Sequence, residues 1–506
     1  MEVLQWIYDK LDWIDGNILW GIPMIVLILG CGIFITVRTK ALQVRKFGYT
    51  LKQTMGRSIR QMKGEKLMLD DDGANLSPFE AFSTAISGTV GTGNIVGVTS
   101  AIISGGPGAV FWMWVSAFFG MITKFAEITL GVFFRKKDEK GEYIGGPMFY
   151  IEKGLKQKWL AVLFAVFAML AAIGMSSVQA KTIQGNWKTT FDMPIWVTAI
   201  IIAVLAGIVI IGGIKRIGKV ASMLVPFMAI FFVIMAVINV CCNITSIPDA
   251  FSSIFSSAFT AKSAVGGFIG YGIQQAMRFG VARGIFSNES GLGSSPMAHT
   301  NASEIEPVRQ GMWGVFEVFF DTFVICTLTA LFVLTSGLDV TVGLTPEQIK
   351  NIDAEVVALN AFTNMGGVFG EICKYSFAVI LPMFAFTTIL AWAVYGSKAC
   401  KYIFKGKYSE LVFNIIYIVM IIVMGLITFF AGDNLASGFV WLISDMTNAL
   451  MAIPNLIAVI CLSGLLIKIV KNYFDRKNGK DVVPMLSAYD DVNNELAQKI
   501  KGQKID

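Results

Sequence analysis

The chain has 506 residues, of which 55% are hydrophobic and 15% are charged. A soluble domain carries about 25% charged residues, so this composition excludes an ordinary soluble protein and indicates one that lies in a lipid bilayer. The net charge of +6 does not indicate a nucleic-acid partner, because the basic residues lie in short loops between apolar blocks. Seven cysteines without CxxC spacing and a single histidine, His299, exclude a zinc site and a histidine-rich catalytic site.

The first predicted element is a short amphipathic segment over residues 1–16 that lies at the membrane interface. Glu2 and Asp9 stand where a cleavable signal would carry positive charge, so no such signal is predicted. An apolar block over residues 17–37 follows. It is long enough to cross a hydrocarbon core of roughly 30 Å, so it predicts the first transmembrane helix.

Ten more apolar blocks follow along the chain. The sequence therefore predicts an all-α polytopic membrane protein with eleven transmembrane helices, the last of them long enough to contain a turn near Asp445 or Pro454. A long loop is predicted over residues 337–361, and a polar tail over residues 468–506. The eleven spans are expected at about 18–37, 78–104, 109–134, 159–184, 195–214, 221–240, 265–286, 312–335, 368–391, 411–431 and 437–467.

The distribution of basic residues predicts the orientation of these spans. If the eleven spans alternate in direction, 34 of the 41 Lys and Arg residues lie on one side of the membrane and five on the other, while Lys124 and Lys181 lie inside spans. Loops that are rich in Lys and Arg stay in the cytoplasm. A multi-pass protein of the cell membrane is therefore expected, with its amino end outside and its tail in the cytoplasm.

The second span contains a predicted interruption. Ser77, Pro78 and Glu80 form the signature of a helix start, a capping box with proline at the first helical position. Residues 88–94 then hold three glycines and two threonines, which are poor helix formers. Close helix packing explains one or two such residues. The whole cluster favours a discontinuous helix, whose free carbonyl groups can bind a cation.

The seventh span shows a similar glycine-rich interruption near residues 266–276. The orientation count makes the second and seventh spans cross the membrane in opposite directions. Two interrupted spans at corresponding places in two halves are typical of a transporter with an inverted repeat.

Several long motifs give the chain a family resemblance. It resembles the alanine or glycine:cation symporters through residues 88–95, 105–114, 120–127, 280–299 and 384–396. The resemblance implies uptake of alanine, glycine or glutamine, driven usually by sodium, with no organic cofactor and no obligatory protein partner. It also implies a fold similar to that of the neurotransmitter:sodium symporters, with ten helices in a five-plus-five inverted repeat. Here the two repeats would be residues 77–240 and 265–467, with the first helix as an addition.

The resemblance also assigns site residues. The sodium ion would bind carbonyl groups of Ser87, Val90 and Phe384 and the hydroxyl groups of Thr387 and Thr388. The amino-acid site would consist of Thr92, Gly93, Asn94, Gln179, Ile273, Met277 and Trp392.

Lys181 departs from the family pattern around Gln179. Positions two apart point about 200° apart on a helix, so Lys181 need not enter the pocket with Gln179 and can extend outward. If Lys181 does face the pocket, the usual substrate range of the family does not apply.

Charged residues inside spans leave two readings open. Lys124 with Glu127, and Glu317 with Asp321, lie on common helix faces and form either a structural ion-pair cluster or a proton relay. No nucleophile–base pair or nucleotide-binding loop indicates an enzyme, and no carbonyl ring indicates a channel. The sequence thus predicts sodium-coupled import of a small neutral amino acid, most simply alanine or glycine. The alternatives are a proton-coupled transporter and a glutamine-preferring member of the family.

Overall fold

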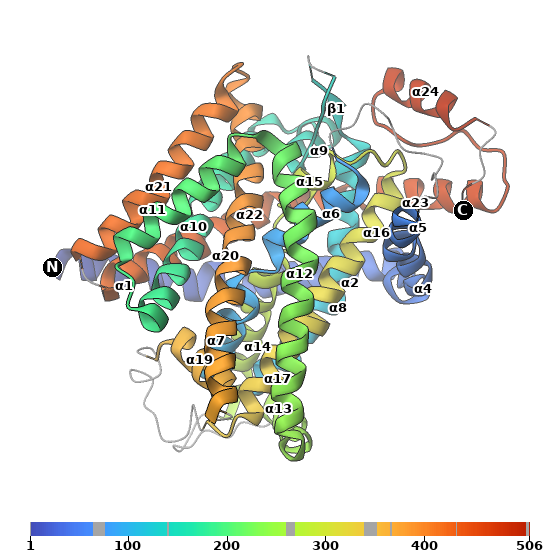
Figure 1. Ribbon diagram of the computed structural model, residues 1–506. Helices are drawn as coiled ribbons and strands as arrows, with labels where there is room; N and C mark the ends of the chain where they lie inside the picture. Colours follow the sequence, from blue (N-terminus) through green and yellow to red (C-terminus); the bar gives the residue numbers. More distant parts are fainter. Residues whose placement is uncertain are drawn as a thin grey trace.

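The protein is almost entirely α-helical (Figure 1). The computed structural model describes residues 2–63, 76–138, 141–259, 269–338, 352–364, 367–431, 433–501 and 505. Within these residues the only sheet is a hairpin of β1 (Lys136–Lys137) and β2 (Tyr143–Ile144).

Helices occupy all eleven predicted spans, and the fold is that of an all-α polytopic membrane protein. Among the described residues, eight helices are long and apolar enough to cross a membrane, and a bent pair adds a ninth crossing. The other two regions hold helices that are shorter or less apolar, α11 and α14. The helices are α2 (Ile22–Arg38), α6 (Pro78–Thr89) with α7 (Val96–Gly105), α8 (Gly108–Phe133), α10 (Lys158–Phe191), α11 (Ile195–Ile210), α12 (Gly213–Cys242), α14 (Ile269–Asn288), α16 (Pro307–Val318) with α17 (Thr327–Thr335), α20 (Gly367–Phe404), α21 (Ser409–Ala431) and α22 (Asp433–Cys461).

The start of α6 forms as predicted. The Ser77 hydroxyl accepts from the Glu80 amide at 3.2 Å, and the Glu80 carboxylate accepts from the Ser77 amide at 2.9 Å. These bonds satisfy amide groups that the first turn of a helix leaves free. The capping box therefore fixes the start of the helix at Pro78.

Exposed apolar side chains mark the faces that meet lipid. On α11 these are Ile200, Val204 and Ile208, which recur every fourth residue and so lie on one face. The opposite face of the same helix is buried, with Ala199, Ala203 and other small residues. Small side chains let membrane helices approach closely.

The amino-terminal segment packs against the helical body. Helix α1 (Glu2–Ile14) leads through a π-helical turn (Asp15–Leu19) into α2. The Tyr8 ring meets that of Phe439 at 5.3 Å. A side chain on Gly16 would collide with the Arg278 guanidinium, so Arg278 lies beside this turn. Arg278 thus lies within α14 and not in a loop.

Short elements gather at two opposite ends of the molecule. Figure 1 shows β1 and α9 (Pro147–Gly154) at the upper end, and α13 (Ile247–Phe259) and α19 (Ala354–Thr363) at the lower end. We call the end with β1 the basic end, because the loops richest in Lys and Arg meet there. The predicted long loop is partly helical, since α19 begins after Asp353, whose carboxylate accepts from the Glu355 amide at 2.8 Å. Residues 339–351 of that loop lie outside the described residues.

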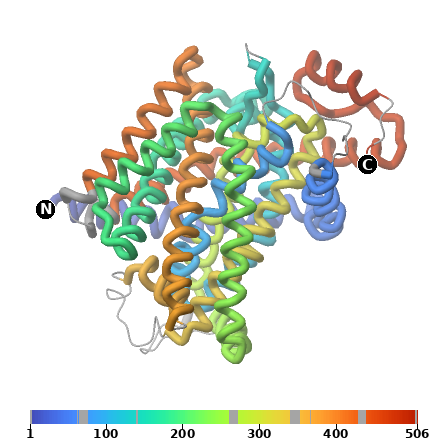
Figure 2. The backbone as a smooth tube through the Cα atoms, viewed as in Figure 1, coloured from blue at the N-terminus to red at the C-terminus, as the bar shows by residue number. Residues whose placement is uncertain are grey.

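The carboxyl-terminal region differs from the prediction. Helix α22 ends at Cys461 and a separate helix, α23 (Ser463–Lys477), follows it directly. The predicted boundary between span and tail at residue 468 therefore falls inside α23. The tail continues to α24 (Asp490–Lys499), and α24 and α1 lie on opposite sides of the molecule (Figure 2).

The tail is held to the body by charge and apolar contact. Arg476 binds both carboxylate oxygens of Glu306, at 2.6 and 2.8 Å. The Ala488 amide donates to the Phe133 carbonyl at 2.8 Å. Four further tail and loop residues form a small apolar cluster, Ile305, Leu486, Leu496 and Ile500.

Candidate functional site

The chain is interrupted between α6 and α7, at the predicted place. The two helices bend by 55° across residues 90–95, with one 3-10 turn (Thr92–Asn94) between them. The Gly91 amide donates to the Asn94 side-chain oxygen at 2.8 Å, and the Thr92 amide to the Gln179 side-chain oxygen at 3.3 Å. Side chains thus complement the backbone carbonyls that accept from the other amides here. We call residues 90–95 the first break.

A glycine is required in the first break. A Cβ atom on Gly91 would collide with the hydroxyl oxygen of Thr388. The same Cβ atom would lie 3.6 Å from the side-chain oxygen of Gln179. Helices α10 and α20 therefore approach the first break directly at Gly91.

Four of the five predicted sodium ligands converge beside the first break. The Thr388 hydroxyl donates to the Ser87 carbonyl at 2.9 Å and to the Phe384 carbonyl at 3.0 Å. The Thr387 hydroxyl also lies 3.0 Å from the Phe384 carbonyl. All four residues are buried. The fifth, Val90, caps α6, and its amide binds the Ile86 carbonyl at 2.7 Å.

The predicted amino-acid site is brought together in part. Thr92, Gly93, Asn94 and Gln179 meet at the first break and are buried. The Thr92 hydroxyl has no hydrogen-bond partner among the described residues, so it is free to bind a ligand. Trp392 is fully buried one helical turn beyond Thr388.

Ile273 and Met277 are not brought to the first break. Gly93 lies against the Phe286 ring, where a Cβ atom would be 3.2 Å from it. Gly105, at the far end of α7, lies equally close to Phe279. Helix α14 therefore runs antiparallel to α7. Ile273 and Met277 lie near the far end of α7, about 13 Å or more along α14 from the residues that face Gly93.

The second interruption lies elsewhere than predicted. Helix α14 is continuous from Ile269 to Asn288, so residues 269–276 hold no break, and residues 266–268 lie outside the described part of the chain. The helix ends instead at Glu289, with a φ of +54°, followed by Gly291 and Gly293 with φ of +92° and +77°. We call residues 289–295 the second break. The Gly-Leu-Gly and Ser-Ser-Pro strings were its signal in the sequence.

Asp321 joins the first break to the last turn of α14, a contact that sequence reasoning did not find. Its carboxylate accepts from the Asn94 side-chain amide at 2.6 Å and from the Ser287 hydroxyl at 3.0 and 3.1 Å. Asp321 lies in a π-helical turn (Phe319–Cys326) between α16 and α17. Such turns are frequent at functional sites because they redirect a side chain. Here the turn coincides with the residue that contacts Asn94.

Glu317 has a different role from its neighbour Asp321. The Lys124 ammonium lies 2.7 Å from the Glu317 carboxylate and donates to the Asn288 carbonyl at 2.6 Å. Ser295 and His299 bind the same carboxylate at 3.1 and 3.4 Å. All of these groups are buried. The arrangement supports the structural ion-pair reading for Lys124 and Glu317, and it anchors both ends of the second break.

Glu127 and Lys181 lie away from the first break. Asn455 donates to the Glu127 carboxylate and, at 2.9 Å, to the Gly291 carbonyl. Lys181 interacts electrostatically with Glu355 of α19. Glu355 lies close to Gly185, one turn beyond Lys181 on the same face of α10. Lys181 thus lies toward α19, whereas Gln179 lies toward Thr92.

Comparison with known proteins yields a consistent set of matches. A family model described as the sodium:alanine symporter family matches residues 1–486. The sodium/alanine symporter AgcS of Methanococcus maripaludis is 38% identical over 469 residues, which cover 92% of this chain and 97% of that protein. An uncharacterized transporter of Haemophilus influenzae is 40% identical over 462 residues, 91% and 95% of the two chains. The probable sodium/glutamine symporter GlnT of Bacillus subtilis is 35% identical over 482 residues, 95% and 94% of the two chains.

Solved structures match in fold. The structure of MhsT in complex with L-phenylalanine has a TM-score of 0.54 at 13% identity and covers 86% of this chain and 97% of that chain. A manganese transporter of Eremococcus coleocola has a TM-score of 0.52 at 13% identity, with coverage of 84% and 91%. At such low identity these matches concern the arrangement of helices alone.

Proposed function

Because the chain belongs to the sodium:alanine symporter family, a family of amino acid:cation symporters of the membrane, we propose that it imports a small neutral amino acid together with sodium. Alanine or glycine is the proposed substrate, and alternating access the mechanism. The observation that carries the proposal is the convergence of Ser87, Phe384, Thr387 and Thr388 beside the first break.

These oxygens suit a sodium ion. They are neutral, hard oxygen ligands from an interrupted helix and from a helix that crosses it, as in other transporters with broken helices. We propose that Val90 adds its carbonyl, since the chain leaves helical geometry at this residue. The ion would replace the hydrogen bonds that the two threonine hydroxyls now make.

The proposed amino acid binds at the same break. Its carboxylate would meet the backbone amides of Thr92 and Gly93 and the Thr92 hydroxyl, where the positive end of a helical turn favours an anion. Asn94 and Gln179 supply polar groups, and Trp392 limits the volume. Both cargo molecules thus contact the same interrupted segment, so each stabilises the conformation that the other prefers.

We also propose the orientation that the basic residues indicate, with the amino end outside and the basic end in the cytoplasm of the cell membrane. The two repeats, residues 77–240 and 265–467, would then each begin with an interrupted helix. In this proposal the second break at residues 289–295 would take the place of the one expected near 266–276.

Uptake by the purified protein in liposomes tests the proposal. Labelled alanine, glycine and glutamine would be offered under an inward gradient of sodium, potassium or protons. We expect accumulation of alanine or glycine with the sodium gradient alone. Equal uptake under all three gradients would contradict symport, and a preference for glutamine would favour the reading suggested by the relative GlnT.

A proton-coupled mechanism is the second candidate, and the contact of Asp321 with Asn94 favours it. A carboxylate at that position could carry a proton across with the amino acid. The Asp321→Asn protein decides between them. If it keeps sodium-driven uptake and only its yield falls, the proton relay is excluded.

A further inference from the structure

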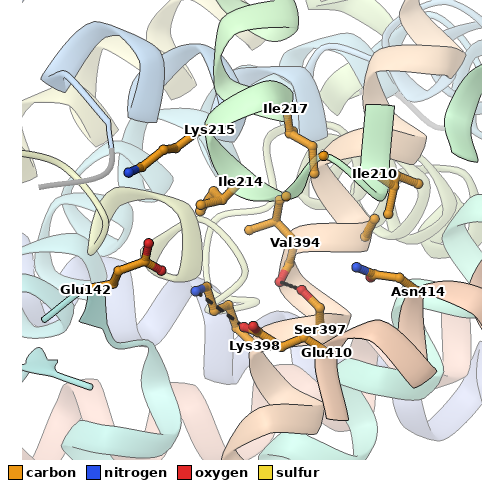
Figure 3. Close-up of a pocket in the computed structure, with 13 residues that line it drawn as sticks. Glu142, Ile210, Ile214, Lys215, Ile217, Val394, Ser397, Lys398, Glu410 and Asn414 are labelled. Atoms are coloured by element: carbon orange, nitrogen blue, oxygen red, sulfur yellow. Dashed lines mark hydrogen bonds and ion pairs between the residues drawn. The ribbon is translucent and has the colours of Figure 1, made fainter. Parts of the chain in front are cut away.

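A polar cavity lies at the basic end, apart from both breaks. It has a volume of about 200 Å³ and is bordered by the α11–α12 turn, the last turns of α20 and the first turns of α21. A water molecule occupies about 30 Å³ in the liquid, so the cavity holds several waters or one molecule of the size of alanine. Figure 3 shows Lys398 and Glu410 between Glu142 on one side and Asn414 on the other.

The lining carries balanced charge. Lys215 and Lys398 supply two ammonium groups, and Glu142 and Glu410 supply two carboxylates. A site for a phosphate or another simple anion would not contain two carboxylates. Balanced charges instead complement a small molecule that carries one charge of each sign.

Two buried groups in the cavity lack good partners. The Lys398 side chain is 7% exposed. Among the described residues it forms one ion pair, in which its ammonium nitrogen lies 3.5 Å from a carboxylate oxygen of Glu410. An ammonium group has three donors, and a buried charge needs close partners. The buried Asn414 side-chain oxygen has no hydrogen-bond partner within the described part of the chain. The Lys398 ammonium group can therefore bind an anion, and the Asn414 oxygen can accept from a hydrogen-bond donor.

The cavity lies on the helix that carries the proposed sodium ligands. Lys398 follows Thr388 by ten residues on α20, or about 15 Å toward the basic end. Gly88 of α6 packs against Ala391 and Tyr395 in between. The seam between α6 and α20 therefore leads from the first break toward the cavity.

We propose that this cavity is a second amino-acid site, which holds the zwitterion on the basic side of the first break. The carboxylate of the amino acid binds Lys398, and its ammonium group binds Glu410 and the Asn414 oxygen. The proposal rests on the proposed function, since it assumes that the protein carries such molecules.

The number of bound alanine molecules tests the proposal. Equilibrium binding of labelled alanine would be measured on the purified protein in detergent with sodium, for the unchanged chain, Lys398→Met and Lys480→Met. Lys480 is the control, because it pairs with Asp475 at 2.7 Å and does not line the cavity. We expect two alanines for the unchanged chain and for Lys480→Met, and one for Lys398→Met.

Each other outcome overturns the second site. One alanine bound to the unchanged chain, or two bound to Lys398→Met, would refute it while leaving the proposed function intact. No binding at all would refute both. Asn94→Ala provides the converse check. This protein is expected to lose the alanine bound at the first break and to keep the alanine bound in the cavity.

A lipid headgroup is the rival occupant. The same proteins would be placed in bilayer discs of phosphatidylcholine with or without phosphatidylethanolamine, whose headgroup is also zwitterionic. If phosphatidylethanolamine co-purifies in a Lys398-dependent way and alanine binds once in both discs, the cavity is a lipid site and the proposal is wrong.

Discussion

Thr388 connects the two elements of the proposed sodium site, since its hydroxyl bonds to carbonyls of both α6 and α20. We expect Thr388→Val to raise the sodium concentration for half-maximal uptake about ten-fold, the effect of one lost polar interaction of about 1.4 kcal/mol. Thr388→Ser retains the hydroxyl and is expected to restore the affinity. Sodium-dependent uptake in liposomes measures all three proteins.

Thr335→Val is the matched control for this prediction. Its hydroxyl is buried but bonds only to the Leu331 carbonyl of its own helix, at 2.8 Å. We expect this protein to keep its sodium dependence. An equal loss in both valine variants would show that buried threonines stabilise the fold generally and would remove support for the site.

Gly91 and Gly97 offer a second comparison at the scale of one residue. A methyl group on Gly91 would collide with Thr388, whereas one on Gly97 would meet nothing within 4 Å. We therefore expect Gly91→Ala to reach the membrane but lose nearly all uptake, and Gly97→Ala to transport normally. Full uptake by Gly91→Ala would mean that the close approach at the first break is not needed.

The ion pairs of Glu304 predict that the stability of the fold depends on pH. Burial alone would raise the pKa of Glu304, but the guanidinium groups of Arg309 and Arg57, at 3.5 and 2.5 Å, hold that pKa below its ordinary value. The carboxylate therefore stabilises the fold fully above its ordinary pKa, and this contribution is lost as the pH falls through the lowered one. Melting temperatures are expected to fall on acidification.

The Glu304→Gln protein checks the assignment. It removes the negative charge that two buried guanidinium groups share, so a loss of about 3 kcal/mol of stability or more is expected near neutral pH. Its melting temperature should also fall less steeply with acid than that of the unchanged chain. Parallel curves would show that other carboxylates dominate acid unfolding.

Local signals decide which parts of the site can be predicted from the sequence. Ser77 and Glu80 start α6 through bonds between residues three positions apart, and the glycines of residues 88–94 weaken the same helix, so both features stand where the sequence placed them. The contact between Asn94 and Asp321 joins residues 227 positions apart. The periodicity of the sequence does not predict this contact, because the contact depends on how α16 and α17 pack.

At the scale of elements, the second break shows how a glycine pattern can mislead. Residues 269–272 hold two glycines, yet they lie within α14, since a membrane helix tolerates small residues where neighbours pack closely. The helix stops instead at Glu289, a residue that rarely adopts positive φ. The surrounding contacts impose that conformation, among them the Ser294 hydroxyl, 2.5 Å from the Glu289 carboxylate.

The ion pair between α8 and α16 carries a prediction at this scale. Lys124→Met leaves the Glu317 carboxylate buried beside a weaker set of donors, and an unpaired buried charge costs about 3–5 kcal/mol. We expect the double variant Lys124→Met/Glu317→Leu to be more stable than Lys124→Met alone. Thermal melting of the detergent-solubilised proteins measures the difference, and equal melting would exclude a direct pair.

At the scale of the whole molecule, the tail and the connection after α14 form one assembly. Arg476 binds Glu306, and the apolar cluster of α24 packs on Ile305, which follows the second break. We expect Arg476→Ala to increase amide hydrogen exchange in both residues 486–500 and residues 300–306. Faster exchange in the tail alone would show that the two segments are independent.

The helices as a group were predictable because lipid demands long apolar segments, so all eleven spans contain helix. The tail was not predictable from the same principle. Helix α23 is amphipathic rather than apolar, and its buried face depends on partners such as Tyr49, whose hydroxyl lies 2.8 Å from that of Tyr473. The length of the apolar segments therefore could not predict that α23 starts directly after α22.

The hydrogen bonds of the first break have a consequence for selectivity. The Gly91 and Thr92 amides and the Thr388 hydroxyl already have internal acceptors. Entry of cargo is therefore an exchange reaction, in which each internal bond is replaced by one to the newcomer. An apolar molecule offers no hydrogen-bond acceptor and would leave the two amides and the hydroxyl without a partner. If cargo binds as proposed, the first break would admit only a molecule that returns as many polar contacts as it displaces.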